Sequence, residues 1–127
     1  MVNTGEYRYV SLPGIQVYDA MKNLNCDWPA FKKIVFTFYK NRSNSREEIA
    51  TLMARGALNE VREIAHGIRG GSGYVGAWKL HQEAVALEEA CKTGDIDVAK
   101  EHIPSIFLSL DEVIGGLEGL CGSGSIK

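Results

Sequence analysis

The chain has 127 residues, of which 45% are hydrophobic and 24% are charged, and its formal net charge at pH 7 is −2. This composition is ordinary for one globular domain that buries its own core, and the charge gives no basic surface for nucleic acid. No apolar run reaches the roughly 18 residues of a membrane span, and no basic-then-apolar leader opens the chain. We therefore expect a cytoplasmic protein with a protein partner and no membrane insertion.

The three cysteines, Cys26, Cys91 and Cys121, are odd in number and widely spaced. This pattern fits neither a disulfide framework nor a zinc site, and His81 and His102 do not form a metal-binding pair with His66 by spacing. We expect no metal site. Metal binding by the histidines and cysteines is kept as a minor hypothesis, which elemental analysis would test.

The chain is expected to divide into an N-terminal tail or linker (1–13), a folded domain (14–121) and a flexible C-terminal tail (122–127). A short helix is predicted from Gln16 to Leu24. A second helix follows Asp27, which can cap it, with Pro29 tolerated in the first turn. Its aromatic residues stand at core spacing and are expected to pack rather than to bind a cofactor; they are Trp28, Phe31 and Phe38, and Phe107 is interpreted likewise.

A third helix is predicted to begin at Ser45, because Ser45 and Glu48 have the spacing of a capping box. It is expected to end at Gly56. The next helix is predicted from Ala57, and its apolar residues fall on one buried stripe: Leu58, Val61, Ile64, Ala65 and Ile68. We expect this helix to fade between Gly71 and Gly73, because glycine costs about 1 kcal/mol relative to alanine inside a helix.

From Gly76 onward, apolar residues recur at alternating spacings of three and four, which predicts a bundle helix; they are Ala77, Leu80, Ala84, Leu87 and Cys91. Cys91 is expected to be a small buried hydrophobic residue, and three acidic residues are interpreted as a solvated face: Glu83, Glu88 and Glu89. Gly94 should end this helix and Asp95 should cap the next, in which Pro104 causes a kink or a restart. Without strand-like alternation, we expect an all-α fold, an antiparallel four-helix bundle core with short N-terminal capping helices.

The segment from Ala65 to Ala77, AHGIRGGSGYVGA, is the most informative in the chain. On a helix, His66 lies roughly 140° from the centre of the buried stripe, so its imidazole is exposed. Arg62, Gly70 and Gly73 share its face, and Arg69 stands three residues on. Four glycines in this segment leave little bulk around the histidine; they are Gly67, Gly70, Gly71 and Gly73. This predicts that something large docks closely over His66.

The spacing of seven residues in and after this segment resembles the motif of histidine-containing phosphotransfer (HPt) domains; they are His66, Arg69, Gly70, Ser72, Gly76, Ala77 and Leu80. The resemblance covers about residues 12 to 121, including Leu87, Glu88 and the Gly94-Asp95 break. Arg69 stands where lysine is commoner, and Tyr74 replaces a frequent asparagine. Gly67 stands where a larger residue is frequent, and we expect it to loosen the helix.

The resemblance implies that His66 reversibly accepts a phosphoryl group from an aspartyl phosphate on a receiver domain and passes it to another receiver. Its partners would be response-regulator receiver domains and a hybrid sensor histidine kinase, in two-component signal transduction. The receiver would carry Mg²⁺, and this chain would bind no cofactor of its own. An exposed imidazole is largely neutral at pH 7, so no general base is required.

We expect the ring nitrogen farther from the backbone to be phosphorylated. Arg69 would stabilise the phosphoryl oxygens, with Ser72 as a further hydrogen-bond donor, and Gly70 would permit close approach of the partner. Docking of the partner is expected to involve Arg62, Gly73 and Tyr74.

The glycine cluster lacks the lysine-serine or lysine-threonine ending of a phosphate-binding loop, and no strand precedes it, so no ATP-binding or autokinase activity is expected. An alternative is a non-transferring helical interaction module that binds receiver domains without carrying phosphate. The sequence leaves open whether the chain is free-standing or is the C-terminal HPt domain of a hybrid sensor kinase. A monomer is expected, because the bundle can bury its core alone.

Overall fold

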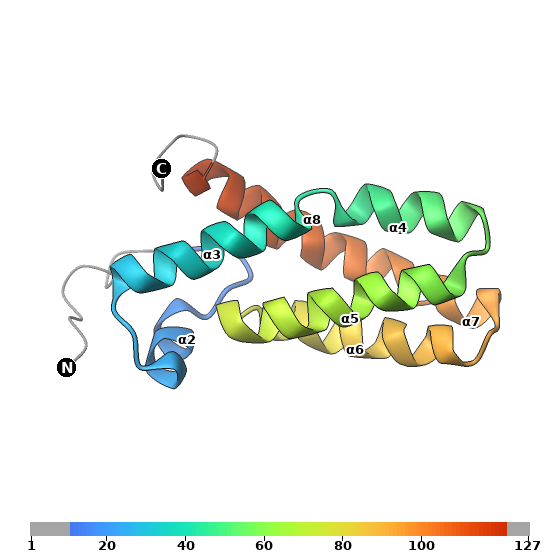
Figure 1. The fold of residues 1–127 in the computed structure, drawn as a ribbon, viewed down its shortest axis with the longest axis horizontal. Helices are drawn as coiled ribbons and strands as arrows, with labels where there is room; N and C mark the ends of the chain where they lie inside the picture. The colour runs from blue at the N-terminus through green and yellow to red at the C-terminus, as the bar shows by residue number, and fades with distance from the viewer. Residues whose placement is uncertain (1–10, 122–127) are drawn as a thin grey trace.

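The computed structural model describes residues 11–121, and in this range the regular structure is helical (Figure 1). The helices are α2 (Val17–Leu24), α3 (Trp28–Arg42), α4 (Ser45–Ala54), α5 (Leu58–Val75), α6 (Trp78–Lys92), α7 (Ile96–Lys100) and α8 (Ile103–Cys121). The described residues form no β-sheet; their β-type pairing is a single isolated bridge between Leu12 and Ile15. The predicted all-α fold is therefore confirmed.

The bundle is built from successive antiparallel segments (Figure 1). Helices α3 and α4 follow one another along one edge, α5 runs back beneath them, α6 reverses again, and α8 returns beside α6 and α3. The short α2 packs against the end of α5, and α7 links α6 to α8. None of the helices in the described range is long and apolar enough to cross a membrane.

Packing starts slightly earlier than the predicted boundary at Gly14. Leu12 is buried, and its carbonyl accepts a hydrogen bond from the Ile15 N–H at 3.1 Å. The Pro13 ring lies against Gly116 of α8, where a Cβ would stand 2.5 Å from the proline ring. Leu12 and Pro13 thus belong to the packed domain rather than to the tail, while residues 1–10 and the predicted tail at 122–127 lie outside the described residues.

The predicted cap of α3 is present, whereas α4 begins at Ser45 as predicted but without the predicted capping box. The Asp27 carboxylate accepts a hydrogen bond from the Ala30 N–H at 3.0 Å, as an N-cap should. Ser45, however, is the first residue of α4 and not its cap, and its buried hydroxyl has no hydrogen-bond partner among the described residues. The capping box is wrong because the chain passes from α3 to α4 through a tight turn that leaves Asn44, the residue before the helix, outside the extended conformation a cap needs.

Helix α5 does not fade at its glycines but continues to Val75, where Gly76 ends it in a left-handed conformation with φ of 82°. The reason is tertiary packing. Gly71 lies directly under the Phe38 ring of α3, and a Cβ there would be only 2.9 Å from that ring. Close contact between the two helices offsets the low helix propensity of glycine.

The second half of the bundle follows its prediction closely. The expected seam of α6 is buried, and burial raises the pKa of the Cys91 thiol, although the nearby Arg62 charge opposes this shift. Gly94 ends the helix with φ of 74°, and the Asp95 carboxylate accepts a hydrogen bond from the Asp97 N–H at 2.9 Å. Pro104 lies in the first turn of α8, which starts anew after α7, so the restart is the correct alternative.

Candidate functional site

His66 lies midway along α5 on the outer surface of the bundle, and its side chain is 70% exposed. One turn further on, Gly70 is also exposed, and no described residue outside its own stretch of helix comes within 4 Å of where a Cβ would stand. The imidazole therefore stands beside bare helix backbone. This agrees with the prediction of an exposed, uncrowded histidine.

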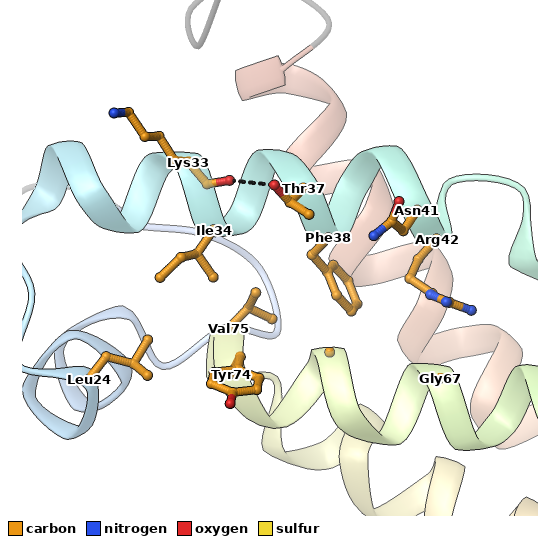
Figure 2. Close-up of a pocket in the computed structure, with 11 residues that line it drawn as sticks. Leu24, Lys33, Ile34, Thr37, Phe38, Asn41, Arg42, Gly67, Tyr74 and Val75 are labelled. Atoms are coloured by element: carbon orange, nitrogen blue, oxygen red, sulfur yellow. Dashed lines mark hydrogen bonds between the residues drawn. The ribbon is translucent and has the colours of Figure 1, made fainter.

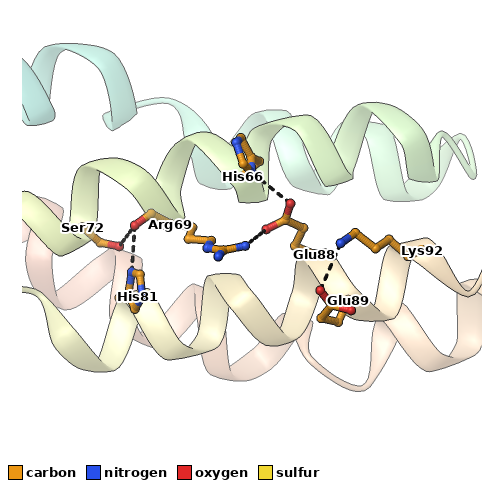
Figure 3. A network of polar contacts seen from close by, with 7 residues as sticks. All are labelled: His66, Arg69, Ser72, His81, Glu88, Glu89 and Lys92. Atoms are coloured by element: carbon orange, nitrogen blue, oxygen red, sulfur yellow. Dashed lines mark hydrogen bonds and ion pairs between the residues drawn. The ribbon is translucent and has the colours of Figure 1, made fainter.

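A buried carboxylate on the neighbouring helix holds the imidazole (Figure 3). Glu88 of α6 places one carboxylate oxygen 2.9 Å from Nδ1 of His66 and the other 3.0 Å from Nη1 of Arg69. The Glu88 side chain is only 8% exposed. Burial by itself would raise the pKa of the Glu88 carboxyl, but the hydrogen bonds and charges of Arg69 and His66 outweigh it and hold that pKa below its ordinary value.

The ionised state of Glu88 fixes the hydrogen-bonding role of each ring nitrogen. An ionised carboxylate can only accept hydrogen bonds, so Nδ1 of His66 must be the protonated nitrogen that donates to it. In the neutral ring, Nε2 then carries the lone pair. The orientation of the imidazole and the identity of its basic nitrogen thus follow from one contact.

The interpretation of Glu83, Glu88 and Glu89 as a solvated face is correct only for Glu89. Glu83 is half-buried, with Oε1 out of contact with solvent. Glu89 is exposed and pairs with Lys92, but Glu88 is buried and bridges two helices. A spacing signal for this was available, because His66 and Glu88 are equidistant from Ala77 in the turn between α5 and α6. In an antiparallel helix pair, residues equidistant from the turn lie at the same height.

The backbone carbonyl of Arg69 is the centre of a second group of contacts (Figure 3). It accepts a hydrogen bond from the Ser72 hydroxyl at 3.2 Å and another from Nδ1–H of His81 at 2.8 Å. Ser72 is fully buried, so its predicted role as a donor to the phosphoryl group is wrong. Its hydroxyl and the His81 ring instead fix the turn of α5 that carries Arg69.

The glycines of α5 do not share one purpose. Gly67 and Gly71 face α3, where they contact Arg42 and Phe38, and Gly73 faces the His81 ring, whose Nδ1 would be 3.5 Å from a Cβ. Among these α5 glycines only Gly70 presents open backbone. The glycines that face α3 or His81 therefore serve packing within the bundle, and docking of a partner over open backbone stays a prediction for Gly70.

The remaining residues predicted for docking lie around this surface. Arg62 is exposed on the turn before His66, and the Tyr74 side chain is prominent, since this residue is 63% exposed. Tyr74, Gly70 and Gly73 line a shallow, mainly apolar hollow of about 350 Å³ that also reaches Leu24 of α2. Arg62 lies outside this hollow.

A second hollow of about 550 Å³ lies on the other side of Tyr74, between α3 and α5 (Figure 2). Ile34 and Phe38 supply its apolar wall, and Lys33 and Arg42 are its charged residues. Figure 2 shows Arg42 at the far end of this hollow, against the stretch of α5 that contains Gly67.

The fold and the site together define a helical-bundle domain that exposes one oriented histidine. A comparison with known families gives the same result, because the family model described as the Hpt domain matches residues 36–119, which is well over half of the chain. The chain therefore belongs to the Hpt domain family, whose members take part in phosphorelay histidine phosphotransfer and interact with response-regulator receivers. No curated protein and no solved structure matches the chain.

Proposed function

We propose that His66 is the phosphoacceptor of this Hpt domain, and that Nε2 accepts a phosphoryl group from an aspartyl phosphate on one receiver domain and passes it to another. The observation that carries this proposal is the hydrogen bond between Nδ1 of His66 and the buried Glu88 carboxylate. It leaves the lone pair on Nε2, the nitrogen that projects farther from the backbone of an imidazole with 70% exposure.

The transfer step is a substitution at phosphorus. The Nε2 lone pair forms the new N–P bond, the bond between phosphorus and the aspartyl oxygen breaks, and the aspartate carboxylate leaves with the electron pair. The imidazole becomes positively charged as this bond forms, because Nδ1 keeps its proton. The Glu88 carboxylate, 2.9 Å from Nδ1, stabilises that charge, and the same contact operates when the phosphoryl group leaves again.

Arg69 is the proposed contact for the phosphoryl oxygens. Its Nη1 is held by Glu88 at 3.0 Å, and the side chain is still 43% exposed. A guanidinium group has five N–H donors, so others can bind the incoming oxygens while Nη1 keeps the group in place. Gly70 would let the receiver approach the helix backbone, and the receiver would supply Mg²⁺.

The surface around His66 supports docking of a receiver domain. The hollow beside Gly70 and Tyr74 has an apolar lining, and Arg62 is exposed one turn before His66. We place this exchange in the cytoplasm, with the chain as a monomer and a hybrid sensor histidine kinase as the source of one receiver.

The test is transfer from a radiolabelled, phosphorylated receiver domain with Mg²⁺ to the unmutated chain and to His66→Gln. We expect acid-labile, base-stable label on the unmutated chain alone. Equal labelling of His66→Gln would contradict the assignment of the phosphoacceptor. Binding to a broad panel of receivers without any label would instead support the alternative, a helical module that binds receivers without carrying phosphate.

A further inference from the structure

Gly67 is the residue for which the phosphotransfer site gives no reason. It follows His66 in the interior of α5, where alanine would be favoured by about 1 kcal/mol. A Cβ built at this position would lie 2.8 Å from Nη2 and 3.1 Å from Cζ of Arg42, so the guanidinium group occupies the space that a side chain would fill. The expectation that Gly67 loosens α5 is therefore wrong. Gly67 instead leaves the space in which the Arg42 guanidinium lies, and we call this space the seat of Arg42.

Arg42 is the last residue of α3, and its half-buried side chain reaches α5 without an ion-pair partner among residues 11–121. The ion pairs in this range join Arg46 to Asp111, His66 and Arg69 to Glu88, and Lys92 to Glu89. Glu47 and Glu118 line a hollow on the other side of Arg42, yet neither forms an ion pair with it. Within this range, therefore, no direct contact neutralises the positive charge of Arg42.

The net charge around His66 before and after phosphorylation indicates a role for the Arg42 cation. Neutral His66, cationic Arg69 and anionic Glu88 sum to zero. A phosphoryl group carries close to two negative charges, while the ring, which keeps its Nδ1 proton, gains one positive charge, so the net charge of the site falls to about −1. Arg69 already shares its charge with the Glu88 carboxylate. A second guanidinium would restore the balance.

We propose that Arg42 is a second phosphoryl-binding residue, which moves from its seat on Gly67 to the oxygens of the phosphoryl group on His66. This inference rests on the proposed function. Arg42 and Arg69 approach α5 from opposite sides, from α3 and from the α6-facing side, with the exposed strip of His66 and Gly70 between them. Arg62 is also cationic, but it is exposed and lacks such a seat, so ordering it would cost more side-chain entropy.

The test uses phosphoramidate, a small phosphoryl donor that requires no receiver. Nε2 of His66 attacks phosphorus, the P–N bond breaks, and the nitrogen leaves as ammonia after taking up a proton from water. We expect Arg42→Gln to slow this labelling roughly tenfold, as expected for loss of one charge-assisted contact, and Arg42→Lys to be intermediate. Lys40→Gln is the matched control, because Lys40 is an exposed cation on the same helix that does not line the hollow.

A ³¹P titration supplies a measurement that a merely structural role would not change. A guanidinium in contact with the phosphoryl group favours its dianion, so the second ionisation of the phosphoryl group should occur at lower pH in the unmutated chain than in Arg42→Gln. Circular dichroism establishes that each variant is folded.

Equal rates of labelling by phosphoramidate in the unmutated chain and Arg42→Gln would overturn the role of Arg42. Slower transfer from a receiver with an unchanged phosphoramidate rate would also overturn it, since Arg42 would then act on the receiver. If the unmutated chain took no label from phosphoramidate or from any receiver, the proposed function itself would fail, and the role of Arg42 with it.

Discussion

Replacement of Glu88 by glutamine tests the central contact of the site. Glutamine has nearly the same shape, but its amide offers one acceptor and one donor where the carboxylate offers two acceptors. Arg69 is permanently charged and takes the amide oxygen, so the amide NH₂ faces Nδ1 of His66. The imidazole must then accept at Nδ1 and carry its proton on Nε2, which is the wrong tautomer for attack on phosphorus.

The magnitude follows from the contacts that are lost. A hydrogen bond to a charged group contributes about 1.5–3 kcal/mol. In Glu88→Gln the ring must spend a free energy of this size to reach the reactive tautomer, so phosphorylation of His66 should be slower by roughly 10- to 100-fold. Stability should fall less than for a fully buried ion pair, by about 1–2 kcal/mol, because His66 and Arg69 are 70% and 43% exposed and water can solvate them. Urea unfolding and phosphoramidate labelling measure the two effects.

The matched control is Glu89→Gln, next in the chain, whose side chain is 61% exposed and pairs with Lys92. This exposed pair should contribute little to stability, and the labelling rate should not change. A Glu88→Gln variant that accepts phosphate as fast as Glu89→Gln would refute the argument that Glu88 sets the tautomer of His66.

Three further predictions concern pH and the packing of α5. The Glu88 carboxyl has a lowered pKa in the folded chain, so its stabilising contribution is complete above the ordinary carboxyl pKa and is lost as pH falls through the lowered value; acid titrations of urea stability should be flatter in Glu88→Gln. Gly67→Ala should stabilise the chain by up to about 1 kcal/mol, because the flexible end of Arg42 can move aside. Gly71→Ala should destabilise it by about 1–3 kcal/mol, because the buried Phe38 ring cannot move aside. Thermal unfolding of both variants measures these opposite effects. Ser72→Ala should lose about 0.5–1.5 kcal/mol of stability but keep a near-normal rate of phosphorylation, and a large loss of rate would restore Ser72 as a direct contact.

Local chemistry made much of the bundle predictable from the sequence. Asp27 caps α3 and Gly94 ends α6, because these residues satisfy backbone requirements that neighbouring residues alone define. The helical repeat likewise placed His66 on the surface and Ile68 in the core. The capping box predicted at Ser45 is wrong because such a motif also requires an extended backbone, which the tight turn after α3 does not supply.

The partners of the site residues were not predictable in this way, because they depend on which helices meet. Glu88 looks like any acidic residue on an amphipathic helix until α6 lies against α5. Ser72 looks like a phosphate ligand until its burial directs the hydroxyl to a backbone carbonyl. Gly67 and Gly71 look like a docking surface until α3 covers them. In each case the residue type is correct for the motif, and the tertiary contact decides its role.

On the proposed function, the Glu88 carboxylate gives the site opposing properties before and after transfer. Before transfer it orients His66 and stabilises the charge that develops on the ring as Nε2 attacks. After transfer the same carboxylate faces a dianionic group on the same imidazole, and part of the Arg69 charge is already committed to it. A site that activates its nucleophile with an anion therefore holds the phosphoryl group less tightly than a purely cationic site would. This would suit a carrier that must release the group. We therefore expect the number of cations near His66, rather than the nucleophile itself, to set the lifetime of the phosphorylated form.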